Sequence, residues 1–297
     1  MNVLISGSSG LIGSALAERL AADGHAVGRL LRPPREPNAG DALWDPAAGM
    51  VDVGALEGRD AVVHLAGENI GRRWSRKIIA RIRDSRVGGT RLLCDALARL
   101  DEPPDVLLTA SGIGLYGSRG EEALDEASAM GEGFMADLCR DWEAAAAPAA
   151  EAGIRVVNLR LALVLSAAGG ALKRMLRPFR LGLGGRVGSG RQYWSWVTLT
   201  DAVAAFAFAL TSPGLSGPVN VASPKAVTSR EFTAALGRVL HRPTFLPAPA
   251  WGVRLAFGKM ADELLLASAR VLPKKLLEAG FTFRQADLEP ALRQILT

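Results

Sequence analysis

The sequence predicts an α/β fold, a doubly wound parallel sheet with helices on both faces. Three observations predict it: short apolar runs alternate with helical stretches through the first half, a glycine-rich turn follows the first apolar run, and 49% of the 297 residues are hydrophobic. Strands are expected at 2–5, 26–31, 61–66, 105–109 and 155–161, and helices at 11–22, 75–99 and 134–152. The strands are short and continuously apolar, as is typical of parallel strands buried on both faces.

The alternation ends after residue 165. Residues 166–197 are rich in loops and glycine, whereas 198–224 hold an apolar helix and a short strand that are expected to return to the sheet. From residue 225 the sequence is helical and punctuated by prolines. We therefore predict a Rossmann-type domain over 1–165, joined by 198–224, and a smaller, mostly helical substrate-side domain formed by 166–197 and 225–297.

Composition excludes several classes of function. The net charge of +5 is concentrated in residues 71–91, but no nucleic-acid motif accompanies it. This stretch is either a solvated helix face or an electropositive rim for a phosphorylated ligand, and nucleic acid is not an expected partner. No apolar run reaches the roughly 18 to 20 residues of a membrane helix, so no membrane partner is expected. Cys94 and Cys139 form no CxxC or metal-binding pattern, and a reducing cytoplasm fits them.

The turn GSSGLIG, residues 7–13, lies between the first strand and the first helix. Glycines at 7, 10 and 13 permit a tight turn, close approach to a pyrophosphate and packing of helix on strand. This is the context that a dinucleotide-binding loop requires, although a tight turn kept for packing is the alternative. The residues expected to contact the cofactor are Gly7, Ser8, Ser9, Gly10, Leu11, Ile12 and Gly13.

The residue that ends the second strand indicates which dinucleotide is bound. An acidic side chain there would bond the ribose 2′-OH, but this chain has Arg32, with Arg35 close behind. A guanidinium can bind a 2′-phosphate through two charge-assisted hydrogen bonds, so NADP(H) is favoured over NAD. If Arg32 is only a solvated loop residue, the preference disappears.

The segment HLAGENIG, residues 64–71, follows the third of these strands. Leu65, Ala66, Gly67 and Glu68 are expected to approach the adenosine half of the cofactor, and Asn69 to face the substrate. His64 is interpreted as a strand residue satisfied by a neighbouring backbone group rather than as a base.

Ordered motifs along the whole chain carry a family resemblance. They include GSSGLIG, HLAGENI, RWSRKIIARIRDSRVGGT, FMADLCRDWE, GLGGRVGSGRQYWSWV, GPVNVASPKAVTSREFT and LPKKLLEAGFTF. Together they resemble the short-chain dehydrogenase/reductase superfamily in its extended branch of NAD(P)-dependent epimerases and dehydratases, and within it an atypical family of epimerase-like proteins. The resemblance implies the fold and a nicotinamide cofactor, while the reaction is left open.

The resemblance also implies site residues. Ser111 matches the substrate-orienting serine and Tyr116 the tyrosine that exchanges a proton with the substrate, but Gly120 stands where the family has a lysine. No lysine occurs between Lys77 and Lys173. A neutral tyrosine, with an ordinary pKa of about 10, can donate a proton but is a poor base, so reduction is favoured over oxidation. The arginines that could replace the missing charge are Arg72, Arg73, Arg119 and Arg160.

On the substrate side, Trp74, Gln192, Trp194 and Trp196 are candidates for ligand contact, with core packing of the tryptophans as the alternative. The predicted function is an NADP(H)-dependent, epimerase-like oxidoreductase acting on a small polar carbonyl compound or a nucleotide sugar. The alternative is an NADPH-binding module without turnover. The resemblance further allows a homodimer through the helices at 75–99 and 134–152, and no metal site is expected.

Overall fold

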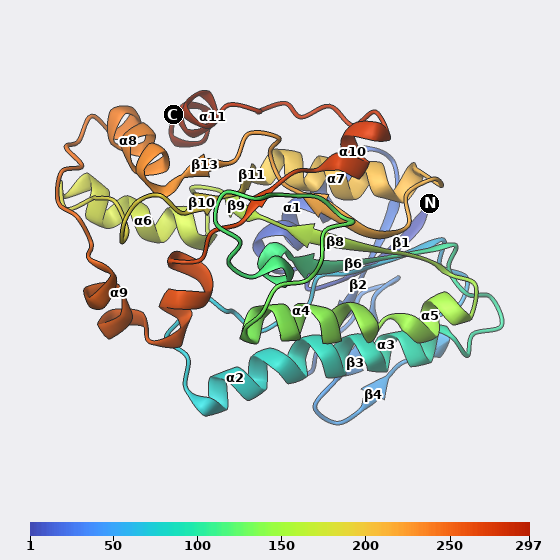
Figure 1. Ribbon diagram of the computed structural model, residues 1–297. Helices are drawn as coiled ribbons and strands as arrows, with labels where there is room; N and C mark the ends of the chain where they lie inside the picture. The colour runs from blue at the N-terminus through green and yellow to red at the C-terminus, as the bar shows by residue number, and fades with distance from the viewer.

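The computed structural model describes residues 1–297 and has an eight-stranded sheet at its centre (Figure 1). In spatial order the strands are β12 (Gly217–Val221), β8 (Arg155–Leu161), β6 (Val106–Gly112), β5 (Ala61–His64), β1 (Asn2–Ser6), β2 (Ala26–Leu31), β3 (Ala42–Asp45) and β4 (Met50–Val51). All neighbours pair parallel except β3 and β4. The chain winds outward from β1 in both directions, which confirms the doubly wound sheet.

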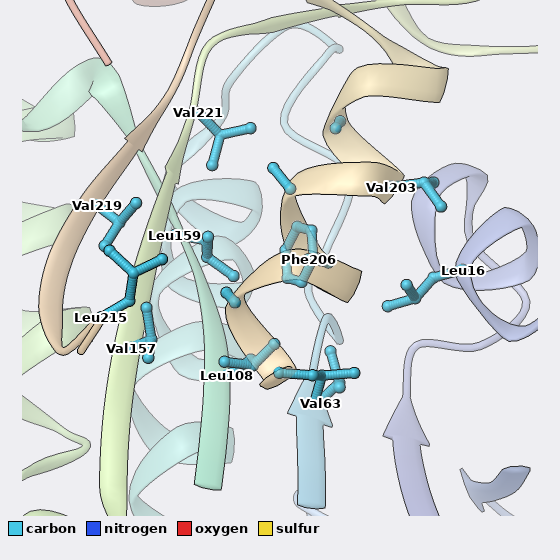
Figure 2. Packing of buried hydrophobic residues seen from close by; sticks show 14 of the residues in the cluster. Leu16, Val63, Leu108, Val157, Leu159, Val203, Phe206, Leu215, Val219 and Val221 are labelled. Atoms are coloured by element: carbon cyan, nitrogen blue, oxygen red, sulfur yellow. The ribbon is translucent and has the colours of Figure 1, made fainter. Parts of the chain in front are cut away.

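Alternate residues of each strand supply the cores on the two faces of the sheet, as a period of two requires. Val3 and Ile5 of β1 face α1 (Leu11–Ala22) and α7 (Leu199–Thr211), whereas Leu4 faces α3 (Gly89–Leu97) and α5 (Ala147–Glu151). Figure 2 shows Phe206 of α7 among the apolar side chains of the strands. Its full burial contributes roughly 2–3 kcal/mol and fixes α7 over the sheet.

The two long predicted helices depart from a regular α-helix. Residues 76–97 form α2 (Arg76–Arg83), a π-helical turn at Asp84–Gly88, and α3. The second runs as α4 (Phe134–Ala144) and α5, with a break beside Pro148, which has no backbone N–H to continue the α4 ladder. Sequence analysis also missed β3 and β4, because ALWD and MV are too short to show a period.

The rest of the chain packs beside β12 and at the carboxyl edge of the sheet. The helices are α6 (Gly170–Arg180), α8 (Ser229–Leu240), α9 (Ala250–Phe257), α10 (Lys274–Glu278) and α11 (Leu288–Leu296). Three two-stranded pairings tie them to the sheet: β9 (Leu163–Leu165) with β11 (Trp196–Thr198), β10 (Tyr193–Trp194) with β13 (Val227–Thr228), and β7 (Ala123–Leu124) with β14 (Arg270–Val271). Helix α9 lies at the periphery, at the end of the molecule that also holds α6 (Figure 1). None of the helices is long and apolar enough to span a bilayer.

Candidate functional site

The glycine turn after β1 is packed against the turn after β5. A Cβ on Gly7 would lie 2.7 Å from the backbone carbonyl of Leu65, and the φ of Gly7 is +67°. A Cβ on Gly13 would lie 2.3 Å from the carbonyl oxygen of Gly7. Because real Cβ contacts do not come so close, a side chain at Gly7 would push the two turns apart, and one at Gly13 would distort the glycine turn itself. The turn is thus a backbone cradle in which glycine is required sterically.

The amino terminus of α1 opens from this cradle with its hydrogen-bond donors free. The backbone N–H groups of Leu11, Ile12 and Gly13 have no acceptor within the chain, and Gly10 at the N-cap has no side chain to bond them. The first turn contains no acidic residue. Free N–H groups at the positive end of a helix dipole are suited to an anion such as a pyrophosphate.

A buried pair behind the cradle holds the two turns together. The Ser6 hydroxyl lies 2.7 Å from Nδ1 of His64 and accepts hydrogen bonds from the backbone N–H groups of Leu65 and Ala66. His64 is fully buried, with its ring edge-on to Trp44, and burial lowers its pKa to about 4. His64 is therefore a neutral strand residue. Its partner is a serine side chain rather than the backbone group expected from the sequence.

Arg32 lies directly after β2, the neighbour of β1, at the same edge of the sheet as the glycine turn. It is exposed, and its guanidinium group makes no hydrogen bond or ion pair with the rest of the chain. No acidic residue stands in its place. The group is free to bind a phosphate that approaches this edge.

Arginine side chains contact the segment that follows β5. The guanidinium of Arg86 lies against Gly67, 3.2 Å from the position of an added Cβ, and donates to the carbonyl of Glu68. The Glu68 carboxylate forms ion pairs with Arg72 and Arg81. Gly67 thus leaves room for a charged side chain to pass beneath the turn, while the carboxylate of Glu68 is already neutralised.

Asn69 is exposed, and its side-chain oxygen accepts a hydrogen bond from the backbone of Gly71 at 2.8 Å. The Arg174 guanidinium of α6 packs against the same glycine, 2.5 Å from the position of an added Cβ. The side-chain amide nitrogen of Asn69 makes no hydrogen bond within the chain, and the exposed residue lies beside this cation. Asn69 is thus the candidate substrate residue that stays accessible.

Tyr116 is fully buried at the end of a short helical turn that follows β6. Its hydroxyl donates to Oδ1 of Asn220 at 2.8 Å and accepts from the guanidinium of Arg160 at 2.9 Å. Arg160 also binds Glu143 through two hydrogen bonds, at 2.8 and 2.9 Å. Ser111 is buried as well and donates to Glu143 at 2.6 Å. The two predicted catalytic residues therefore belong to one continuous buried network.

Burial raises the pKa of Tyr116, and the charge of Arg160 together with its hydrogen bond offsets this only in part. Glu143 neutralises much of the arginine's charge at contact distance. The hydroxyl is accordingly a weaker acid than tyrosine in water, and it stays protonated at neutral pH. The structure also ranks the four candidate arginines, since Arg160 alone contacts Tyr116, while the others bond to Glu68, Leu255 and Glu122.

The candidate aromatic residues and Gln192 lie in the core. Trp74, Trp194 and Trp196 are buried, and their indole N–H groups donate to the carbonyls of Ile70, Leu265 and Lys225. Gln192 is buried and donates to the carbonyls of Val187 and Leu265. In this structure the alternative of core packing describes the tryptophans, because each indole ring finds an apolar environment and a carbonyl for its single donor. Gln192, expected as a polar ligand contact, instead holds two loops together.

Sequence analysis missed Glu143, Asn220 and Ser6 as members of the site. A signal existed for Asn220, because a polar residue in the apolar strand GPVNV must find a buried partner. Glu143 gave no such signal, since a glutamate on a helix is ordinarily solvated. Its buried partner lies on β8, across the contact between α4 and the sheet.

Two surface hollows, each of about 600 Å³, lie away from this edge of the sheet. One lies at the end of α8, around His241, and the other beside the turn between α7 and β12. Neither includes the glycine turn, Arg32 or Tyr116.

Comparison with known proteins assigns the chain to a family. Residues 3–222 match the model of the NAD dependent epimerase/dehydratase family, and residues 248–295 match a domain of unknown function, DUF1731. The epimerase family protein Mb2239 of Mycobacterium bovis is 48% identical over 292 residues, which cover 98% of this chain and 96% of that protein.

Two solved structures extend the comparison. The human epimerase family protein SDR39U1, crystallised with NADPH, is 35% identical with a TM-score of 0.90, over 99% of both chains. The nucleoside-diphosphate sugar epimerase of Corynebacterium glutamicum is 34% identical with a TM-score of 0.82, over 99% of this chain and 57% of that one.

Proposed function

The chain belongs to the NAD dependent epimerase/dehydratase family, and on this premise we propose that it binds NADP(H) and acts as an epimerase-like oxidoreductase. The observation that carries the proposal is the glycine turn, where backbone alone lines a cradle and three N–H groups are free. The human relative crystallised with NADPH supports the choice of cofactor.

Three segments at the carboxyl edge of the sheet would hold the cofactor. The turn of residues 7–13 would bind the pyrophosphate through backbone N–H groups. Leu65 to Glu68 would lie along the adenosine half, where the small residues Ala66 and Gly67 allow close approach. Arg32 would pair with the 2′-phosphate, which NAD lacks.

Bound NADP(H) supplies or accepts a hydride, and the chain's own part is to handle the accompanying proton. Tyr116 is the proposed proton donor. Its raised pKa keeps the hydroxyl protonated, so it can give a proton to a developing alkoxide but cannot accept one at neutral pH. This favours reduction of a carbonyl group, in a small polar compound or a nucleotide sugar. For that step the Tyr116 hydroxyl must leave Asn220 and face the substrate.

A second candidate function is NADPH binding without turnover. The burial of Tyr116 favours it, because the hydroxyl is enclosed and both its hydrogen-bond partners are within the chain. Under this alternative the Ser111–Tyr116 network only stiffens the loop after β6.

A turnover assay separates the two candidates. The protein is mixed with NADPH and a panel of carbonyl compounds and nucleotide sugars, and loss of nicotinamide absorbance is followed for wild type and Tyr116→Phe. Loss of a general acid lowers turnover by about 10²–10⁴-fold. Turnover that Tyr116→Phe abolishes, with NADPH affinity unchanged, supports the oxidoreductase. Tight NADPH binding without turnover across the panel would establish the second candidate, and turnover unaffected by the substitution would remove Tyr116 as the donor.

Cofactor choice is tested by Arg32→Glu. We expect NADPH affinity to fall about 100-fold, because a charge-assisted pair becomes a repulsion, while NADH affinity changes little. Calorimetric titration measures both, with the exposed Arg99→Glu as the matched control. Equal losses for the two dinucleotides would refute the role assigned to Arg32.

A further inference from the structure

Helices α6 and α9 lie at one end of the molecule (Figure 1), and several apolar side chains in and beside them are exposed. Phe245 is 76% exposed and Trp251 72% exposed, and Leu181, Leu183 and Leu255 are also exposed. Trp251 and Leu255 are one turn apart on α9, whose buried side is formed by Val253. The other five tryptophans of the chain are all buried. This end therefore displays an aromatic and aliphatic surface that the fold itself does not cover.

Backbone contacts make these side chains neighbours. Gly185 and Phe245 form an antiparallel bridge, and Val187 forms a parallel bridge with Ala248. The backbone of Gly185 also lies against that of Leu246. Residues 181–188 thus run alongside residues 243–250, and α9 follows directly. We call residues 177–186 and 242–257 together the amphiphilic face.

The polar part of this face carries one sign of charge. No acidic residue occurs between Glu151 and Asp201, nor between Glu231 and Asp262. Arg177, Arg180, Arg186 and Arg242 are exposed, and none of them has an ion-pair partner. Arg254 on α9 is the exception, because it pairs with Asp262. Free cations therefore surround the exposed apolar side chains.

We propose that the amphiphilic face docks on the surface of an anionic lipid bilayer. Tryptophan, phenylalanine and leucine beside arginine and lysine are the pattern that inserts shallowly at the headgroup boundary, while the cations meet anionic headgroups. Such contact needs no spanning helix. From the lack of a membrane-spanning segment, the sequence was expected to have no membrane partner. Docking on a bilayer surface departs from that expectation.

The charge of the face favours an anionic bilayer over two other partners, a second copy of the chain and a nucleic acid. A symmetric contact with a second copy would oppose the same unpaired arginines, and like charges repel. Nucleic acid would neutralise the cations, but its phosphates offer little to the exposed apolar side chains of this face, most of which are aliphatic. An anionic bilayer satisfies both the cations and the apolar groups.

The test uses the full chain with vesicles of phosphatidylcholine alone or mixed with phosphatidylglycerol. We expect the protein to sediment with the mixed vesicles only, less at high salt, and to show tryptophan quenching when the acyl chains are brominated. Trp251→Phe should still sediment but lose most of the quenching, since Trp251 is the exposed tryptophan. Arg177→Glu/Arg180→Glu should lower partitioning more than about 30-fold, since removal of the two cations alone costs roughly 1 kcal/mol each and the new carboxylates are repelled as well. Arg91→Glu/Arg99→Glu, on and just after α3, is the matched control and should change it little.

Failure to sediment with the mixed vesicles would overturn the proposal, as would equal losses in the two charge-reversed variants. Sedimentation without quenching of Trp251 would place the contact elsewhere and overturn it too. A concentration-dependent dimer abolished by Leu255→Ser would assign the face to a second copy instead. Thermal unfolding of each variant checks that the fold is retained.

Discussion

The glycine turn and the Tyr116 network lie at the same edge of one sheet, yet the polar groups of the turn lack hydrogen-bond partners and those of the network have them. At the turn, three backbone N–H groups are free and Arg32 is unpaired. Around Tyr116, the hydroxyl, the Arg160 guanidinium and the bound oxygens of Glu143 all find partners within the chain. A region with unsatisfied donors is prepared for a ligand, whereas a buried and satisfied one stabilises the loop it holds.

The largest effect on stability is expected from breaking the buried network around Tyr116. Arg160→Met leaves the Glu143 carboxylate without its cation, and removing one partner of a buried ion pair costs about 3–5 kcal/mol. We expect the free energy of unfolding, measured with urea, to fall by about that amount. The double variant Arg160→Met/Glu143→Leu removes both charges and should recover most of the loss. A double variant as unstable as the single one would contradict the importance of this pairing.

The buried pair of Ser6 and His64, behind the glycine turn, should make the free energy of unfolding depend on pH. His64 has a pKa of about 4 in the folded chain, against about 6.5 when unfolded, so the unfolded state takes up the proton first as pH falls. The stability that neutral His64 contributes is present above pH ~6.5 and is lost between pH ~6.5 and ~4, amounting to roughly 3 kcal/mol. Urea unfolding across this range measures it. His64→Phe should show a shallower decline, and an identical pH profile in the variant would remove His64 as the cause.

A methyl group in the cradle should affect binding more than folding. Gly13→Ala places a Cβ 2.3 Å from the carbonyl of Gly7, which forces the turn away from a bound pyrophosphate. We expect NADPH affinity to fall about 100-fold, equivalent to about 2.7 kcal/mol. Gly88→Ala is the matched control, a helical glycine whose added Cβ meets nothing within 4 Å. Unchanged affinity in Gly13→Ala would show that the cradle does not hold the phosphates.

Local sequence signals predicted the glycine turn, whereas long-range contacts determine the hydrogen-bond network around Tyr116. The strand, the glycine spacing and Arg32 lie within the first 32 residues and could be interpreted from their order. The burial of Tyr116 depends on Asn220 and Arg160, which follow it by 104 and 44 residues. No pattern within one segment indicates such a pairing. Sequence alone left both interpretations of the tryptophans open, because the carbonyl groups that Trp194 and Trp196 bind belong to distant segments. The break beside Pro148, by contrast, has a local cause.

Calorimetric titration with NADPH, NADP, NADH and NAD tests the central claim most directly. The protein is first checked for dinucleotide retained through purification. We expect tight binding of NADPH and much weaker binding of NADH, because only the 2′-phosphate can use Arg32. Failure to bind any dinucleotide, in protein shown to be folded and free of retained cofactor, would contradict the assignment of the glycine turn.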